Sequence, residues 1–179
     1  MASLDEMEIV RRLSIDVPVD IARLTKELGV EYVEKPMGPE ESGKIQRVGP
    51  GYRITVNSTE GPQRRRFTAA HELGHYLLHR DMVSERGHLD RLFSSGSSGV
   101  GDFINPMHEV QANRFAAELL MPSERVRREA ETSDDVSVLA RRFGVSPAAM
   151  RVRLESLGLL TPVRLIEVPP AEISGGRRD

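Results

Sequence analysis

The chain has 179 residues, a formal net charge of −2 and no cysteine. This length suits one domain with a sizeable buried core, and the lack of cysteine excludes disulfides, thiolate nucleophiles and cysteine-ligated metals. The small net charge gives no overall attraction to nucleic acid or to an anionic membrane. No stretch approaches the roughly 18 apolar residues of a membrane span, and the N-terminus does not resemble a signal peptide. We therefore expect a soluble cytoplasmic protein.

The first third of the chain predicts one short helix followed by a small sheet. Residues 18–29 (PVDIARLTKELG) have one apolar helical face and end at a glycine. Three segments with strand character follow, at residues 30–36, 43–49 and 51–57. Gly49-Pro50-Gly51 is a strong turn signal between the last two segments. We therefore expect a small antiparallel meander.

Two longer helices are predicted in the middle of the chain. Residues 62–79 (PQRRRFTAAHELGHYLLH) are apolar on most sides, which indicates a central, buried helix. Residues 94–101 (SSGSSGVG) have the composition of a flexible loop. A second helix is expected over 105–121, with Asn105 as its N-cap and Pro106 in its first turn.

The rest of the chain predicts a helical C-terminal part, residues 122–160, followed by a flexible tail, residues 161–179. Three short helices are expected there, at residues 123–131, 135–143 and 147–157. The predicted fold class is therefore α+β, with a small antiparallel sheet packed on a helical bundle. Residues 1–160 are predicted to form a single domain.

The segment HELGH, residues 71–75, carries the clearest chemistry in the sequence. His71 and His75 are four residues apart, so a helix places their Cβ atoms about 5–6 Å apart on one face. Both rings then reach one ion at roughly 2.0–2.1 Å. Glu72 lies about 100° further round the helix, where it can accept a proton from an attacking water. The spacing predicts a zinc site with Glu72 as the catalytic base, although an ordinary helix can match HExxH by chance.

A hydrolytic zinc usually has three protein ligands and one open position. The extended pattern HExxHxxGxxH fails here, because Leu78 and Asp81 occupy its glycine and last histidine positions. Glu109 is the best third-ligand candidate, because small residues follow it on the second apolar helix and allow close packing. The alternative is a solvated glutamate stabilised by the helix dipole, and spacing does not decide between the two.

The sequence contains three further histidines, His79, His88 and His108. His79 continues the face of His71 and His75 one turn later, too far along the helix to bind the same ion easily. We expect it to orient another group from outside the coordination shell. His88 and His108 are candidates for spare ligands or transition-state donors, although lone histidines are more often neither.

The segments RRFTAAHELGHYLLH and HEVQANRFAAELLMP together resemble the ImmA/IrrE family of metallopeptidases, and the resemblance extends over roughly residues 16–160. It implies a zincin-like fold, with zinc bound by His71, His75 and Glu109 and with Glu72 as the base. Manganese is an alternative ion in activity assays. Family members are bacterial or phage regulators that cut a partner helix-turn-helix repressor, often encoded beside them. The resemblance implies a protein substrate of that kind, and this chain looks like the short stand-alone type.

The segment LARRFGVSPAAMRVRL, residues 139–154, supports a competing interpretation. It is typical of a helix-turn-helix, and Arg141, Arg142, Arg151 and Arg153 are candidates for phosphate contacts. The chain would then be a DNA-binding regulator with a structural or vestigial metal. The alternative is that the unit closes the protease core or docks the repressor. We favour this alternative because the same segment belongs to the family resemblance, and the charge of the whole chain gives DNA binding no support. A degenerate protease acting as a binding module is a third interpretation.

Overall fold

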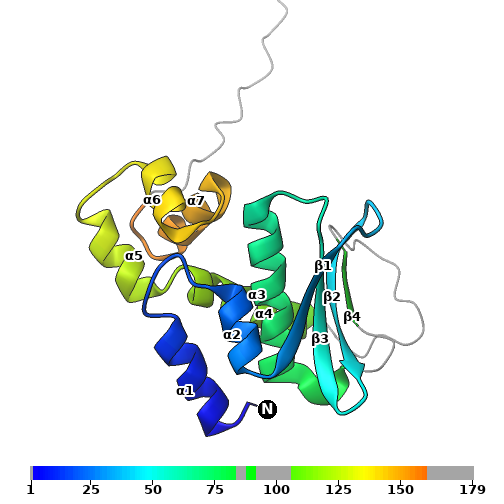
Figure 1. The fold of residues 1–179 in the computed structure, drawn as a ribbon. Coiled ribbons are helices and arrows are strands. Elements are labelled where there is room, and N and C mark those ends of the chain that lie inside the picture. The colour runs from blue at the N-terminus through cyan, green and yellow to red at the C-terminus, as the bar shows by residue number, and fades with distance from the viewer. Residues whose placement is uncertain (1, 84–87, 92–105, 161–179) are drawn as a thin grey trace, which may run out of the picture.

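The computed structural model describes residues 2–83, 88–91 and 106–160. This part of the chain contains seven α-helices, one short 3-10 helix at Arg80–Met82 and a four-stranded sheet, which confirms the α+β class (Figure 1). The helices are Leu4–Leu13 (α1), Ile21–Glu27 (α2), Pro62–His79 (α3), Pro106–Leu120 (α4), Ser123–Ala130 (α5), Val136–Phe143 (α6) and Pro147–Ser156 (α7). The strands are Val30–Lys35 (β1), Glu41–Val48 (β2), Gly51–Asn57 (β3) and His88–Arg91 (β4).

The sheet is mixed, so the predicted antiparallel meander is wrong in one connection. Its strand order is β1-β3-β2-β4, with β1 parallel to β3 and with β2 antiparallel to both β3 and β4. The second half of β3 is entirely buried, as a central strand requires. The chain therefore leaves β1, skips one strand position to form β2, and returns through the predicted turn to place β3 between them.

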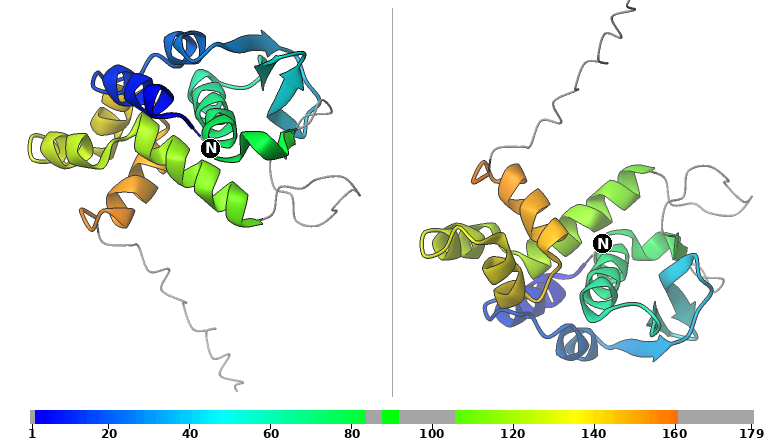
Figure 2. Two further views of the ribbon diagram at one scale, coloured as in Figure 1. Left: turned by 90° about the horizontal axis from the view of Figure 1, so that it is seen from below. Right: turned by 90° about the horizontal axis from the view of Figure 1, so that it is seen from above.

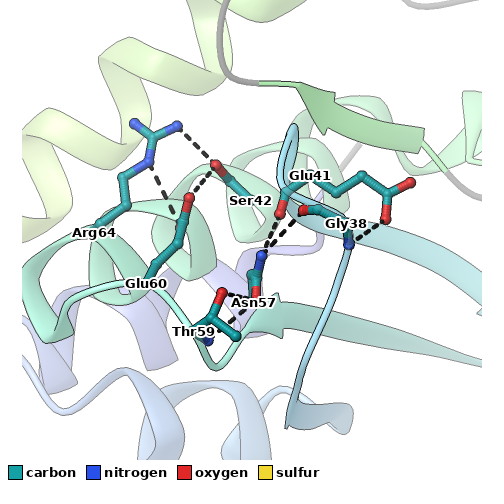
Figure 3. A network of polar contacts seen from close by, with 7 residues as sticks. All are labelled: Gly38, Glu41, Ser42, Asn57, Thr59, Glu60 and Arg64. Carbon is teal, nitrogen blue, oxygen red and sulfur yellow. Dashed lines mark hydrogen bonds and ion pairs between the residues drawn. The ribbon is translucent and has the colours of Figure 1, made fainter.

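Asn57, the last residue of β3, holds the connection between β1 and β2 (Figure 3). Its side-chain oxygen accepts a hydrogen bond from the Met37 backbone at 3.2 Å. Its side-chain nitrogen donates to the carbonyls of Gly38 and Glu41 at 3.3 and 2.8 Å. One buried amide thus satisfies backbone groups that the crossover leaves without sheet partners. This contact pattern explains a topology that strand propensity alone does not predict.

A second part of the same network fastens the start of α3 to the sheet (Figure 3). The Ser42 hydroxyl on β2 is fully buried and donates to Glu60 at 2.8 Å, while Arg64 on α3 donates to Ser42 at 3.0 Å. Glu60 and Arg64 also form an ion pair at 3.8 Å. The orientation of α3 against β2 is therefore fixed by polar contacts before its apolar residues begin.

Helix α3 lies at the centre of the molecule, as predicted, with the sheet on one side and α4 on another (Figures 1 and 2). Every residue from Thr68 to Leu77 is buried. The helices α5, α6 and α7 gather at the end of the molecule away from the sheet (Figure 2). Their bounds agree with the three predicted C-terminal helices to within one residue. A left-handed Gly144, with φ of 65°, separates α6 from α7 in a helix-turn-helix-like arrangement.

Three described elements were not predicted, namely α1, β4 and the 3-10 helix at Arg80–Met82, and one predicted helix begins later than expected. Helix α1 starts at a capping box formed by Ser3 and Glu6, and β4 adds to the edge of β2. Helix α2 begins at Ile21 because Asp20 caps it, accepting a hydrogen bond from the Arg23 backbone at 3.0 Å. The predicted loop at 94–101, the Asn105 cap and the tail at 161–179 lie outside the described residues.

Glu6 attaches α1 to the end of α3. It accepts hydrogen bonds from the Tyr76 hydroxyl at 2.9 Å and from the Arg80 guanidinium. Partial burial raises the pKa of the Glu6 carboxyl, but hydrogen bonds from Arg80, the Ser3 backbone and Tyr76 outweigh this and lower the pKa to about 2. The side chain therefore stays ionised near neutral pH. Among the described residues, no helix combines the length and apolarity needed to cross a membrane.

Candidate metal centre

The structure brings His71, His75 and Glu109 together between α3 and α4. The Nε2 atoms of the two histidines are 3.0 Å apart. Nε2 of His71 lies 3.3 Å from Oε2 of Glu109, and Nε2 of His75 lies 3.3 Å from Oε1 of the same carboxylate. Donor atoms that share a tetrahedral zinc at about 2.0–2.1 Å are roughly 3.3 Å apart. The three side chains therefore have a separation and a donor chemistry that fit one metal ion, as the grouping of their ligand atoms also indicates.

Close packing of α3 and α4 makes this cluster possible. Gly74 lies one residue before His75 and faces Ala112, three residues after Glu109. A Cβ atom at Gly74 would lie 3.1 Å from the Ala112 Cα and 3.2 Å from the Ala112 carbonyl oxygen. The glycine thus allows the helices to approach closely enough for the short carboxylate of Glu109 to reach both rings.

Glu72 is completely buried, directly after His71 on α3. A carboxylate in such surroundings is costly to ionise unless a cation or hydrogen-bond donors compensate. An ion held by the neighbouring histidines would supply such a charge. Glu72 is therefore buried beside the His-His-Glu cluster, where a glutamate that accepts a proton would need to lie.

A second layer of polar contacts surrounds the two histidines. The Nδ1 atom of His71 lies 3.1 Å from the side-chain oxygen of Asn113. The Nδ1 atom of His75 lies 3.2 Å from Nδ1 of His79, whose Nε2 lies 2.7 Å from the side-chain oxygen of Gln111. Both rings thus direct Nε2 toward Glu109 and Nδ1 away from it. The predicted position of His79, outside the ligand set, matches this arrangement.

Sequence reasoning missed Asn113 and Gln111. Asn113 follows Glu109 by four residues, so helical spacing could have placed both on one face of α4. Gln111 follows Glu109 by two residues, a spacing that gives no such signal.

His108 lies close to the ring of His79, with centroids 4.5 Å apart. The suggested role of His88 is not tested by the described side chains.

The pKa of the His79 ring lies below its ordinary value. Burial lowers its pKa from the ordinary value of 6.5, and the nearby His108 adds to that effect, while the hydrogen bond with Gln111 opposes it. A neutral imidazole has one nitrogen that donates and one that accepts.

The arginines of the helix-turn-helix-like unit are partly engaged within the protein. Arg142 pairs with Glu129 and also donates to the Thr132 hydroxyl at 3.1 Å. Arg153 pairs with Glu118 and donates to the carbonyl of Met121 at 2.9 Å. These contacts tie α6 and α7 to the neighbouring helices. Two of the four arginines considered for phosphate binding therefore have structural partners.

The fold and the cluster define an α+β protein whose central helix and its neighbour offer a His-His-Glu site for one metal ion. Residues 25–155, most of the chain, match the family described as the IrrE N-terminal-like domain, Peptidase M78. The chain belongs to this family.

Two similar curated proteins are each called radiation response metalloprotease IrrE. The one from Deinococcus radiodurans is 32% identical over 136 residues, which is 70% of this chain and 38% of that protein. The one from Deinococcus deserti is 37% identical over 97 residues, which is 52% of this chain and 32% of that protein. The chain thus spans about a third of the length of these relatives.

A solved structure of a Mycobacterium tuberculosis transcriptional regulator has a similar fold. Its TM-score is 0.54 at 22% sequence identity, and the match covers 91% of this chain and 49% of that one. At this identity the likeness concerns the fold alone.

Proposed function

We propose that the chain is a zinc-dependent endopeptidase in which His71, His75 and Glu109 bind the ion and Glu72 is the catalytic base. The observation that carries the proposal is the grouping of these side chains: the two histidine Nε2 atoms are 3.0 Å apart, and each lies 3.3 Å from one of the two oxygens of the Glu109 carboxylate. Membership of a peptidase family and relatives named as metalloproteases support it.

A bound zinc supplies Lewis acidity, which makes water a better nucleophile and polarises a peptide carbonyl. The protein contributes the base and the orientation of the ligands. Glu72 accepts the proton of the attacking water and afterwards returns it to the departing amine nitrogen. Its full burial keeps the carboxylate out of bulk solvent, so that the proton stays at the site.

The proposed substrate is a helix-turn-helix repressor encoded next to this protein, cut in the cytoplasm at one exposed segment. An extended segment can pair with an edge strand of the sheet. Among the described strands, the edges of the sheet are β1 and β4. Glu31 and Glu34 on β1 form ion pairs at 2.8 Å with Arg53 and Arg65, and such a charged edge disfavours strand addition. The sequence of β4 also contains two charged residues, Asp90 and Arg91, so charge does not choose between the two edges, and we propose that the substrate pairs with an edge of this sheet.

The substitution Glu72→Gln tests the role of the base. Glutamine keeps the size and shape of glutamate but cannot accept the proton, so we expect cleavage of the repressor to fall by about 10²–10⁴-fold. Zinc content and thermal unfolding should stay unchanged. Glu124→Gln, on the exposed surface of α5, is the matched control and should cleave normally. Wild-type cleavage by Glu72→Gln would exclude this glutamate as the base.

A second experiment tests the ligands and the substrate class. Elemental analysis should give about one zinc per chain, and Glu109→Ala should lose it, because two protein ligands hold zinc far less well than three. Incubation with casein and with the neighbouring repressor, each with and without chelator, tests selectivity. Chelator-sensitive digestion of casein with the repressor left intact would make the protein a general peptidase.

A further inference from the structure

Three side chains form a chain of contacts that leads away from the proposed metal site. The contacts run from His75 on α3 to His79, one turn further along the same helix, and then to Gln111 on α4. The two steps join Nδ1 of His75 to Nδ1 of His79 at 3.2 Å and Nε2 of His79 to Oε1 of Gln111 at 2.7 Å. His75 and His79 are buried, whereas Gln111 is exposed. The contacts thus connect a proposed ligand to the protein surface.

The chemistry of imidazole fixes which atom donates in each of these two contacts. Each neutral ring carries one N–H, so the role of one nitrogen sets the role of the other. If His75 binds an ion through Nε2, its proton is on Nδ1 and is donated to Nδ1 of His79. The proton of His79 is then on Nε2 and is donated to the amide oxygen of Gln111. The reverse order would place a proton on Nε2 of His75 and block the metal-binding lone pair.

We infer that His79 and Gln111 are positioning residues that select the metal-binding tautomer of His75. The inference rests on the proposed function, because it assigns His75 to the metal. His79 accepts the proton that His75 must hold away from the ion, and Gln111 keeps His79 in the accepting tautomer. Ligand histidines depend on such partners for both orientation and basicity.

The same role is filled differently at the other histidine. His71 places Nδ1 against the amide oxygen of Asn113, which accepts a proton without an intermediate ring. Asn113 and Gln111 both belong to α4, as does Glu109. For His75 the distance to α4 is bridged by the ring of His79. A leucine could fill the same buried volume but would offer no acceptor to His75.

Zinc affinity and histidine tautomers test the inference without measuring catalysis. In zinc-loaded protein with ¹⁵N-labelled histidine, the nitrogen shifts report which ring atom of His79 carries the proton. We expect the proton on Nε2. His79→Leu should weaken zinc binding by about 10–100-fold in competition with a chromophoric chelator. His79→Asn, whose side-chain oxygen can take the place of Nδ1, should recover most of that loss.

Two further variants separate positioning from packing. Gln111→Leu changes an exposed residue, so it should leave the fold intact while weakening zinc binding in the same direction. Leu78→Ala alters the neighbouring side chain, which is 39% exposed, and should bind zinc like the wild type. A His79 proton on Nδ1, or His79→Leu and Gln111→Leu proteins that bind zinc as tightly as the wild type, would overturn the inference. A wild-type protein that binds no zinc would instead overturn the metal site, and the inference with it.

Discussion

Substituting Gly74 by alanine should weaken both the fold and the metal site. The new Cβ would lie 3.1 Å from the Ala112 Cα, 3.2 Å from its carbonyl oxygen and 3.2 Å from Cδ1 of Phe115. Two of these atoms belong to the backbone of α4, so the whole helix must move by a few tenths of an ångström. Overpacking of this kind costs about 1–3 kcal/mol, while alanine improves helix propensity by about 1 kcal/mol. We expect a net loss of about 1 kcal/mol.

The same displacement should move Glu109 away from the two histidines of α3, which are 3.3 Å from its oxygens. Urea unfolding in the presence of chelator measures the packing effect alone, and zinc competition measures the effect on the site. We expect several-fold weaker zinc binding. Gly51→Ala is the control, because its nearest neighbour would be the Val48 carbonyl oxygen at 3.9 Å. A Gly74→Ala protein stabilised by about 1 kcal/mol, as propensity alone predicts, with unchanged zinc affinity, would refute the reasoning.

Three further substitutions test other contacts. Glu6→Gln should lower the free energy of unfolding by about 1–3 kcal/mol at neutral pH. The folded-state pKa of Glu6 is lowered from 4.5 to about 2. The difference in unfolding free energy should therefore be complete above about pH 4.5 and shrink as the pH falls toward 2. A difference of constant size across this pH range in urea titrations would contradict the assignment. Gly144→Ala should cost about 1–3 kcal/mol, because φ is 65° and the new Cβ would lie 3.1 Å from Pro18; an unchanged melting temperature would contradict this. Asn113→Leu should weaken zinc binding about 10-fold, measured by chelator competition, because His71 loses its acceptor; unchanged affinity would show that Asn113 has no such role.

The proximity of the candidate ligands could be predicted from the sequence because it depends on two local regularities. Helical spacing alone places His71 and His75 on one face of α3. The small residues of α4 indicate that another helix packs closely, and Gly74 marks the point of contact. Spacing does not decide whether Glu109 contacts the histidines or is a solvated glutamate. The family resemblance favours the contact.

The sheet topology could not be predicted in the same way. The segments of β1, β2 and β3 were located correctly, because strand propensity and the turn at Gly49 are local features. Their order depends on the crossover held by Asn57, whose partners are 16–20 residues away in the sequence. An asparagine at the end of a strand resembles an ordinary turn residue until those partners are known. The parallel pairing of β1 with β3 is therefore a tertiary property.

The rotation of α4 about its axis determines whether the site exists. Glu109, Gln111 and Asn113 reach different atoms on α3, and a shift of one residue along α4 would turn each of them by about 100°. A single ligand contact can be restored by a change of rotamer, but three contacts from one rigid helix cannot be restored together. The backbone contact between Gly74 and Ala112 fixes this rotation at the level of the ligands. Substitutions there should therefore affect all three contacts at once, whereas changes at Asn113 or Gln111 should each affect one of the two proposed ligand histidines, His71 or His75 respectively.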